Sequence, residues 1–253
     1  MKNIAFFTWI TNSHKNTLVD FNGFYKSFKC FHPDIDLIVF EQDIIDKLRN
    51  QKPWLTTTNC KASFAKLLYN DYETVVNVDS DFYFLGRCHE ILEQNYDIAA
   101  CANYNIVLNT TLKEQTLLNK KINFVDEVRY VQGGLIAGKN KNFWDEYEAL
   151  SEEISHLLPT YENDVLNILW HSGRYQTKIL DGDYDFNSPN FNCYYNCSSL
   201  GRLSQCMLID DGVYLDNKPM RSYHVAFGWH SMKPRFSQLF PHHISRWFYN
   251  KIG

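Results

Sequence analysis

The sequence predicts a single α/β domain in which helices cover both faces of a mainly parallel sheet. Two runs of β-branched and aromatic residues, 4–11 and 35–40, are separated by a polar segment, 14–29, that is compatible with a helix. This order of strand, helix and strand is typical of parallel sheets. The runs lack strict alternation of apolar and polar residues, which indicates burial on both faces. The length of 253 residues fits one such domain or two small ones, and we expect one.

The rest of the chain continues the alternation of helices and strands. Apolar residues at helical spacing predict a helix over 61–70, which leads through a turn into the apolar run 74–78. Asn, Gly and Ser dominate 181–202, which indicates loops. We expect further strands at 96–103, 129–138 and 176–180, a long helix at 142–158, and another at 162–173 that ends at Gly173.

Composition and charge exclude several classes of protein. The formal net charge of −4 argues against a nucleic-acid-binding protein, which would show a basic excess. No apolar stretch approaches the roughly 18–20 residues of a membrane span. The 7 scattered cysteines indicate free thiols in a reducing compartment, so we expect a cytoplasmic protein. Aromatic residues make up 16% of the chain, which fits either sugar stacking or an aromatic core.

Two aspartates directly follow the apolar run 74–78, in the stretch VVNVDSDFYFLG (75–86). On an extended segment Asp79 and Asp81 point to the same side, while Ser80 points away. Two neighbouring carboxylates repel each other, and a divalent cation removes this repulsion. Mg²⁺ and Mn²⁺ prefer oxygen ligands and leave positions for diphosphate oxygens. Open α/β sheets also bind ligands beyond the carboxyl ends of their strands. The alternative is a solvated turn after a strand.

Four stretches carry a resemblance to a known family. KASFAKLLYNDYETVVNVDSDFYF (61–84) resembles the helix, strand and Asp-x-Asp unit of nucleotide-sugar-dependent glycosyltransferases of the GT-A fold. YVQGGLIAG (130–138) and YENDVLN (161–167) resemble their next two landmarks, and HVAFGWHSMKP (224–234) is similar to a C-terminal signature of the retaining family 8 enzymes. The two middle motifs resemble the retaining family 6 transferases about as well. The resemblance implies a Rossmann-like GT-A catalytic domain over 1–235.

This resemblance implies a metal site and a donor site. Asp79, Asp81 and His224 would hold Mn²⁺ or Mg²⁺, and the imidazole favours Mn²⁺. Asp79 would also contact the donor, and Lys233 would bind the diphosphate, on which negative charge accumulates as the nucleotide leaves. Other residues that the resemblance places at the donor are Phe7, Thr8, Trp9, Thr11, Lys66, Ser80, Gly133, Gly134 and Gly228.

Some of these residues have ordinary alternative roles. Trp9 or Phe7 would stack on the uracil base, but either is equally suited to the core. Gly133 and Gly134 would let a sugar approach the backbone because they have no side chain. His224 alone would be an ordinary core or surface histidine, and the Gly and Lys-Pro that follow it favour the ligand role.

The reacting residues would come from the two middle motifs. Gln132 would bond donor hydroxyls, Asp164 would bind a hydroxyl of the donor sugar, and Asn163 would present its amide to the anomeric carbon. If the enzyme retains configuration, a diphosphate oxygen takes the acceptor proton and no strong protein nucleophile is needed. If it inverts, Glu162 or Asp164 would act as general base. One of the three residues at the helix start, Glu162, Asn163 or Asp164, could simply cap the helix.

The C-terminal segment 236–253 forms an aromatic and basic tail. Its apolar residues fall roughly on one helical face, with basic residues and histidines elsewhere and Pro241 as an interruption. Such a face suits a membrane interface next to lipid-linked acceptors. It suits packing against the catalytic domain equally well. We therefore expect a cytoplasmic protein that either is free or lies peripherally on the inner face of the membrane.

These observations favour a metal-dependent hexosyltransferase that uses a UDP-sugar, of galactose or glucose type, to extend a surface polysaccharide or lipopolysaccharide. A nucleotidyltransferase also pairs aspartates around a metal, but it usually has a glycine-rich basic loop near its N-terminus, and TWITNSHKN (8–16) has no glycine. A catalytically silent sugar- or nucleotide-binding protein on the same fold is a third possibility. A glycoside hydrolase with two carboxylates is the fourth.

Overall fold

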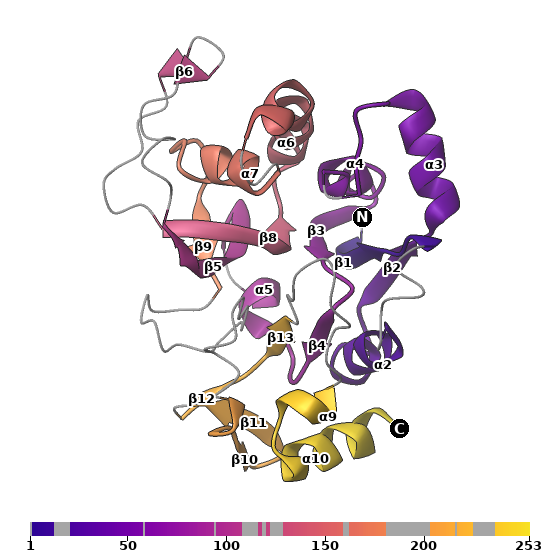
Figure 1. Ribbon diagram of the computed structural model, residues 1–253, viewed down its shortest axis with the longest axis vertical. Helices are drawn as coiled ribbons and strands as arrows, with labels where there is room; N and C mark the ends of the chain where they lie inside the picture. Colours follow the sequence, from indigo (N-terminus) through magenta and orange to yellow (C-terminus); the bar gives the residue numbers. More distant parts are fainter. Residues whose placement is uncertain are drawn as a thin grey trace.

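The computed structural model describes residues 2–12, 21–57, 59–93, 95–107, 116–117, 120–121, 129–158, 162–180, 203–215, 217–224 and 236–253. Its centre is a six-stranded sheet with the order β2-β1-β3-β8-β5-β9 (Figure 1). The strands are β1 (Lys2–Trp9), β2 (Asp36–Phe40), β3 (Tyr72–Val78), β5 (Ile98–Val107), β8 (Arg129–Gly138) and β9 (Thr177–Ile179). The α/β class predicted from the sequence is confirmed.

Strand direction in the sheet is mixed but mostly parallel. β1 runs parallel to β2 and β3, and β5 runs parallel to β9. β8 is antiparallel to both of its neighbours, β3 and β5. Val107 at the end of β5 pairs with Arg129 at the start of β8, so the chain returns at the same end of the sheet. No crossover helix is needed for such a return, which is why this part departs from the parallel pattern.

Helices cover both faces of the sheet, as the sequence predicts (Figure 1). One face carries α3 (Gln42–Gln51), α4 (Lys61–Lys66), α6 (Lys141–Ile154) and α7 (Glu162–Trp170), and a 3-10 turn, η2 (Ser155–Leu157), extends α6. The other face carries α2 (Phe21–Phe31) and α5 (His89–Glu93). Each face therefore has its own hydrophobic core.

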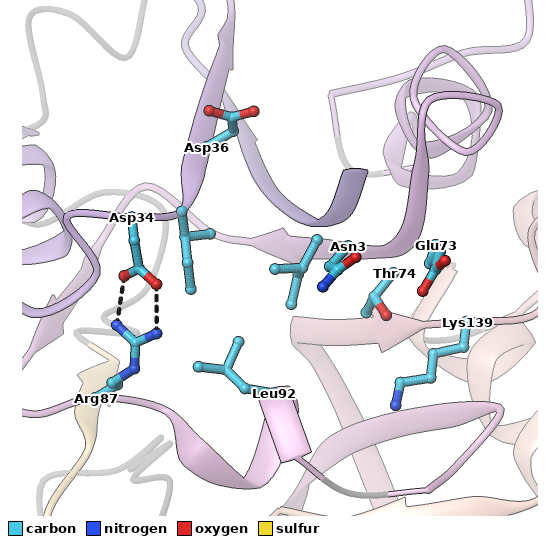
Figure 2. A pocket seen from close by; sticks show the side chains of 10 residues that line it. Asn3, Asp34, Asp36, Glu73, Thr74, Arg87, Leu92 and Lys139 are labelled. Carbon is cyan, nitrogen blue, oxygen red and sulfur yellow. Dashed lines mark hydrogen bonds and ion pairs between the residues drawn. The ribbon is translucent and has the colours of Figure 1, made fainter. Parts of the chain in front are cut away.

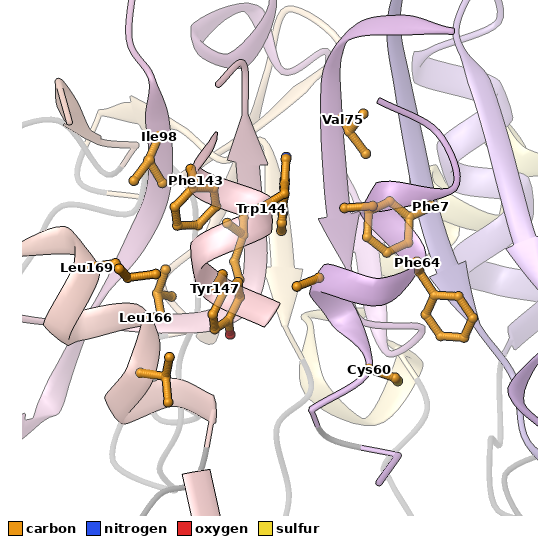
Figure 3. Close-up of a cluster of buried hydrophobic side chains, with 14 of the residues drawn as sticks. Phe7, Cys60, Phe64, Val75, Ile98, Phe143, Trp144, Tyr147, Leu166 and Leu169 are labelled. Atoms are coloured by element: carbon orange, nitrogen blue, oxygen red, sulfur yellow. The ribbon is translucent and has the colours of Figure 1, made fainter. Parts of the chain in front are cut away.

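Successive residues of β1 supply these two cores. Phe7 packs in the first core with residues such as Phe64 and Trp144 (Figure 3), while Phe6 packs in the second with Phe28. All five of these aromatic side chains are fully buried. Large rings fill the space between a sheet and its helices, so core packing accounts for many of the aromatic residues in the described part of the chain.

A third core lies beside the sheet and contains the C-terminus. Most of its buried residues come from β4 (Phe82–Phe84), β11 (Gly212–Leu215), β13 (Ser222–His224), α9 (Phe236–Leu239) and α10 (His242–Ile252). β10 (Met207–Ile209) and β12 (Lys218–Pro219) flank β11 and contribute no buried residue to this core. β10, β11 and β12 form one small antiparallel sheet, and β4 and β13 form another. A further two-stranded pair joins β6 (Thr116–Leu117) and β7 (Lys120–Lys121).

The C-terminal tail packs onto the rest of the chain. Phe236, Phe240, Ile244 and Phe248 are at most 5% exposed, and all lie in the third core. Of the two uses considered for this apolar stripe, packing against the domain is the one that the structure has. None of the helices in the described part of the chain has the length and hydropathy needed to cross a bilayer.

Several boundaries differ from those expected. The helix expected over 61–70 ends at Lys66 and is followed by turns. Helix α3 and the short strands of the third core were not expected, because their apolar patterns are brief. Gly173 has a φ of +71°, a left-handed conformation that suits glycine, and it lies just beyond the end of α7 at Trp170.

His32 is a buried titratable group in the second core. It accepts a hydrogen bond from the Cys88 N–H at Nε2, at 3.1 Å, and its ring stacks on Phe28 at 4.9 Å. Burial, helped by the charge of Arg87, lowers the pKa of His32 from 6.5 to about 4. The imidazole is therefore neutral in the folded protein at neutral pH.

We expect the stability of the fold to fall as the pH drops from 6.5 to about 4. In this range the unfolded chain binds a proton at His32 that the folded chain does not, so the free energy of unfolding should decrease by up to about 1.4 kcal/mol per pH unit from this group. Urea unfolding at several pH values in the same range measures the slope. The variant His32→Phe should show a shallower slope, and an unchanged slope would contradict the prediction.

Candidate metal and donor site

The structure brings Asp79, Asp81 and His224 together beyond the carboxyl end of β3. One ligand atom of each residue lies within 4.8 Å of the others. His224 Nε2 is 3.1 Å from Asp81 Oδ1 and 3.8 Å from Asp79 Oδ2. The side chains of His224 and Asp81 are 4% and 9% exposed, whereas that of Asp79 is 29% exposed. The three residues expected to bind a metal thus form one cluster.

His224 reaches this cluster through the pairing of β4 with β13. Its register partner is Phe82, which follows Asp81 directly. The imidazole stacks on the ring of Phe82, with centroids 4.3 Å apart and an interplanar angle of 16°. An antiparallel ladder of three residue pairs therefore joins two parts of the chain that are 143 residues apart.

The turn that carries the aspartates is held against β8. The N–H of Asp79 donates to the carbonyl of Gly134 at 2.8 Å. The N–H of Gly134 in turn donates to Oε1 of Gln132 at 2.7 Å, and Gln132 is only 1% exposed. In this structure the side-chain amide oxygen of Gln132 thus supports the backbone of β8, and the expected contact of Gln132 with donor hydroxyls stays a prediction.

Side chains occupy the space beside the two glycines of β8. A Cβ on Gly133 would lie 2.6 Å from Oδ1 of Asn163 and 2.9 Å from Nζ of Lys61. A Cβ on Gly134 would lie 2.6 Å from Cε1 of His224. The absence of a Cβ at both positions leaves room for the imidazole of His224 and the amide of Asn163. The expected approach of a sugar to these glycines stays a prediction.

Lys61 is the charged residue at the centre of this arrangement, and the sequence analysis did not single it out. Its amine donates to the carbonyl of Gly133 at 3.0 Å and lies 3.3 Å from Glu162 Oε1 and 3.8 Å from Asp79 Oδ1. Burial alone would lower the pKa of Lys61, but the carboxylates of Asp79 and Glu162 outweigh it and raise that pKa. The amine therefore stays protonated and balances the acidic residues.

Lys66, the lysine that the resemblance places at the donor, faces α6 in the structure. It is on the same helix, α4, but its amine pairs with Asp145 at 2.8 Å and Glu148 at 2.9 Å, both on α6. Five residues along a helix turn the side chain to another face, so only one of the two lysines can reach β8. The signal that could have identified Lys61 is its position at the start of α4, where the helix meets the strand ends.

The start of α7 lies against β8 and Lys61. Oδ1 of Asn163 accepts a hydrogen bond from the N–H of Gly133 at 2.7 Å, which sets the orientation of the amide. Asn167 supports this contact, because its Nδ2 donates to the carbonyls of Asn163 and Val131, each at 2.7 Å. Burial raises the pKa of Glu162, and its partner Lys61 opposes that shift.

The remaining expected site residues are placed less favourably. Phe7 and Thr8 are fully buried, and Thr11 and Asp164 are 3% exposed. Trp9 is 7% exposed and stacks on Phe64 with centroids 5.8 Å apart. The rings of Phe7 and Trp9 thus have core roles, as the alternative interpretation held.

Three more residues were expected to contact the donor, namely Ser80, Gly228 and Lys233. Ser80, between the two aspartates, is half-buried. Gly228 and Lys233 lie outside the described residues, so their expected contacts with the diphosphate stay predictions.

A separate cleft of about 850 Å³ lies at the opposite edge of the sheet (Figure 2). Residues from the beginnings of β1, β2 and β3 line it, whereas Asp79 follows the end of β3. Arg87 in this cleft forms two hydrogen bonds with Asp34, at 2.6 and 2.8 Å. This cleft is therefore distinct from the metal and donor site.

The residues of the cluster fit a divalent cation. Two carboxylates and an imidazole are suitable ligands for Mn²⁺, and Mg²⁺ would use the carboxylates. Asp79 and Asp81 come together in a partly buried place, where their mutual repulsion favours a bound cation. The nearby Lys61 and His224 are suited to hold the two aspartates in position.

Comparison with known proteins places this architecture among glycosyltransferases. The sequence matches no protein-family model and none of the curated proteins. The structure is similar to the galactosyltransferase LgtC, which was solved with donor and acceptor sugar analogues, with a TM-score of 0.60 and 13% identity over 98% of this chain and 95% of that one.

Two longer glycosyltransferases contain a similar structure. GlyE of Streptococcus pneumoniae TIGR4 matches with a TM-score of 0.56 and 12% identity, and the bifunctional WbbM with 0.56 and 14%. The chain is covered completely in both matches but spans only 60% of GlyE and 50% of WbbM. This chain therefore has the GT-A fold that these glycosyltransferases share.

Proposed function

We propose that this chain is a metal-dependent glycosyltransferase that moves a hexose from a UDP-sugar to a glycan acceptor with retention of configuration. The carrying observation is the cluster of Asp79, Asp81 and His224 at the carboxyl edge of the sheet, with Lys61 beside it. The likeness to a galactosyltransferase supports a donor of galactose or glucose type.

The charges of the site suit a diphosphate. Mn²⁺ or Mg²⁺ bound by the cluster would supply positive charge to the leaving nucleotide. Lys61 holds a positive charge next to Asp79 and keeps the carboxylate of Asp79 in place. The side chain of Lys61 is only 5% exposed, so water screens this attraction weakly. Lys233, in the basic C-terminal part of the sequence, would add a further cation for the diphosphate.

Retention is supported by the state of the carboxylates at α7. An inverting enzyme needs a carboxylate that accepts the acceptor proton. Glu162 is 5% exposed and is paired with Lys61, and Asp164 is 3% exposed. Neither is well placed to act as a base towards an incoming acceptor. Asn163, with its amide oriented by Gly133, is then the residue that would face the anomeric carbon.

The acceptor and the cellular setting are further parts of the proposal. A surface polysaccharide or lipopolysaccharide would supply a glycan or lipid-linked acceptor in the cytoplasm. Peripheral membrane contact would have to use the outer side of α10, where His242, His243, Arg246 and Lys251 are exposed, because the apolar stripe is buried. Basic side chains of this kind attract anionic lipids.

The first prediction concerns the reaction. With Mn²⁺, the protein should release UDP from UDP-galactose or UDP-glucose, and the transferred sugar should keep its α configuration by NMR. Asp81→Ala should abolish release, because it removes a ligand that is 9% exposed and faces His224. Pyrophosphate release would instead indicate a nucleotidyltransferase. UDP binding without turnover over a broad acceptor panel would indicate a silent binding protein, and glycan cleavage without any nucleotide would indicate a hydrolase.

The second prediction separates the two lysines of α4. Lys61→Met should lower kcat/KM by about 10²–10³, because it removes a fixed cation next to the donor site. Lys66→Met removes an equal charge from the same helix but only from the pairs with Asp145 and Glu148, so kcat/KM should stay near the wild-type value. Steady-state UDP release measures both variants. Equal losses in the two variants would indicate a general effect on α4.

The third prediction tests the close approach at β8. Gly134→Ala should weaken Mn²⁺ binding by about tenfold or more, because the added methyl group displaces the imidazole of His224. Gly86→Ala is the matched control, since its added Cβ would be no nearer than 3.6 Å to another group. Titration calorimetry with MnCl₂ and UDP measures the affinity. Wild-type affinity in Gly134→Ala would show that His224 is not displaced or is not a ligand.

A further inference from the structure

The ladder of β4 and β13 has little support of its own. It consists of three residue pairs and is a separate two-stranded sheet among the described strands. Two isolated strands of this length are at best marginally stable in water. The ladder nevertheless carries His224 and begins directly after Asp81. The position of the imidazole must therefore be set by what packs against the ladder.

One side of the ladder packs on the second core. Phe82 and Phe84 are fully buried there, and the ring of Phe84 lies 5.3 Å from that of Phe28 on α2. The N–H of Phe84 also donates to Oγ of Ser27 on α2, at 3.1 Å. His224 stacks on Phe82 on this same side. Helix α2 thus supports the half of the ladder that comes from β4.

The opposite side of the ladder packs on the C-terminal segment. Tyr83 and Tyr223 are register partners and are 4% and 1% exposed. The ring of Tyr223 meets that of Phe240 edge-on at 5.4 Å, and the ring of Tyr83 meets that of Phe236 at 5.1 Å. Successive residues of a strand face opposite sides, so Tyr223 faces the C-terminal segment while its neighbour His224 faces Phe82.

The C-terminal segment is itself attached at separate points. Nε1 of Trp247 donates to Asp211 at 2.7 Å, in the turn between β10 and β11. Sγ of Cys30 on α2 donates to the carbonyl of Lys251 at 3.6 Å, and the ring of Trp247 lies 6.2 Å from that of Phe31. Helix α10 therefore bridges α2 and the small sheet, and the ladder is enclosed between α2 and the C-terminal helices.

We propose that the C-terminal segment 236–252 is a positioning element for His224. Through the contact of Phe240 with Tyr223 it holds β13 against β4, and so holds the imidazole in reach of Asp81. This inference rests on the proposed function only in that His224 binds the metal. Phe240 and Tyr223 are positioning residues that touch neither metal nor donor.

The test compares two matched substitutions in the full-length chain. Phe240→Leu shortens a side chain that is 5% exposed in the third core, and Phe143→Leu makes the same change at a fully buried side chain in the first core. Both should lower the melting temperature. Only Phe240→Leu should raise the dissociation constant for Mn²⁺ in the presence of UDP, by about tenfold or more. The electron paramagnetic resonance signal of free Mn²⁺ measures this constant.

A second readout needs no metal. The Hε1 resonance of His224 feels the ring current of Phe82, and among the 9 histidines it is assigned by its loss in His224→Gln. In the metal-free protein this resonance should shift or broaden in Phe240→Leu and stay unchanged in Phe143→Leu. If Phe240→Leu does not fold, Tyr223→Leu should show the same two changes, and Tyr223→Phe, which keeps the ring, should restore the wild-type values.

The outcomes distinguish this inference from the proposed function. A wild-type protein that binds no Mn²⁺ overturns the metal-dependent function, and the resonance of His224 then decides the positioning role by itself. A wild-type protein that binds Mn²⁺, together with unchanged affinity and resonance in Phe240→Leu, overturns the positioning role alone. Equal loss of affinity in both leucine variants also overturns it, because the effect would then follow from stability.

Discussion

The site depends on the balance of charge around Asp79 and Asp81. Two carboxylates at the end of a strand repel each other, and Glu162 adds a third negative group nearby. The structure opposes them with the buried amine of Lys61, which lies between Asp79 and Glu162, and it places the imidazole of His224 beside Asp81. Removing one partner of a buried ion pair is costly because it leaves the other charge uncompensated. This balance links α4, β3, α7 and β13.

Close packing of backbone and side chains makes the balance possible. Lys61 and Asn163 reach β8 only because residue 133 has no Cβ, and His224 reaches it only because residue 134 has none. The carbonyl of Gly133 also receives hydrogen bonds from Lys61 and from Nδ2 of Asn77, both at 3.0 Å. The middle of β8 is therefore the surface on which the polar residues are assembled, and it is held in place by the sheet on either side.

Three separate cores hold these elements. The first supports α4 and α7, and with them Lys61 and Asn163. The second supports β3 and β4, which flank the aspartates, and the third supports the strand that carries His224 through Tyr223. A change in any one core therefore reaches a different residue of the site. Such dependence is common where side chains from distant parts of a chain bind one ion, because their orientation has to be maintained by the surrounding shell.

The sequence by itself determined the local features of this protein. Runs of apolar residues identified all six strands of the central sheet, since burial on both faces leaves a strong pattern. The position of the aspartates after such a run identified the edge of the sheet where a metal would bind, and the order of the motifs pointed to His224.

Tertiary structure decided the features that depend on contacts between distant residues. It selected Lys61 rather than Lys66, because helical rotation and the placement of α4 beside β8 determine which amine reaches the carboxylates. It assigned Gly133 and Gly134 to the packing of Asn163, Lys61 and His224. It also buried the apolar stripe of the tail, where sequence alone left membrane and core equally open. Apolar periodicity indicates that one face of a helix is buried, but only the assembled fold shows which partner covers that face.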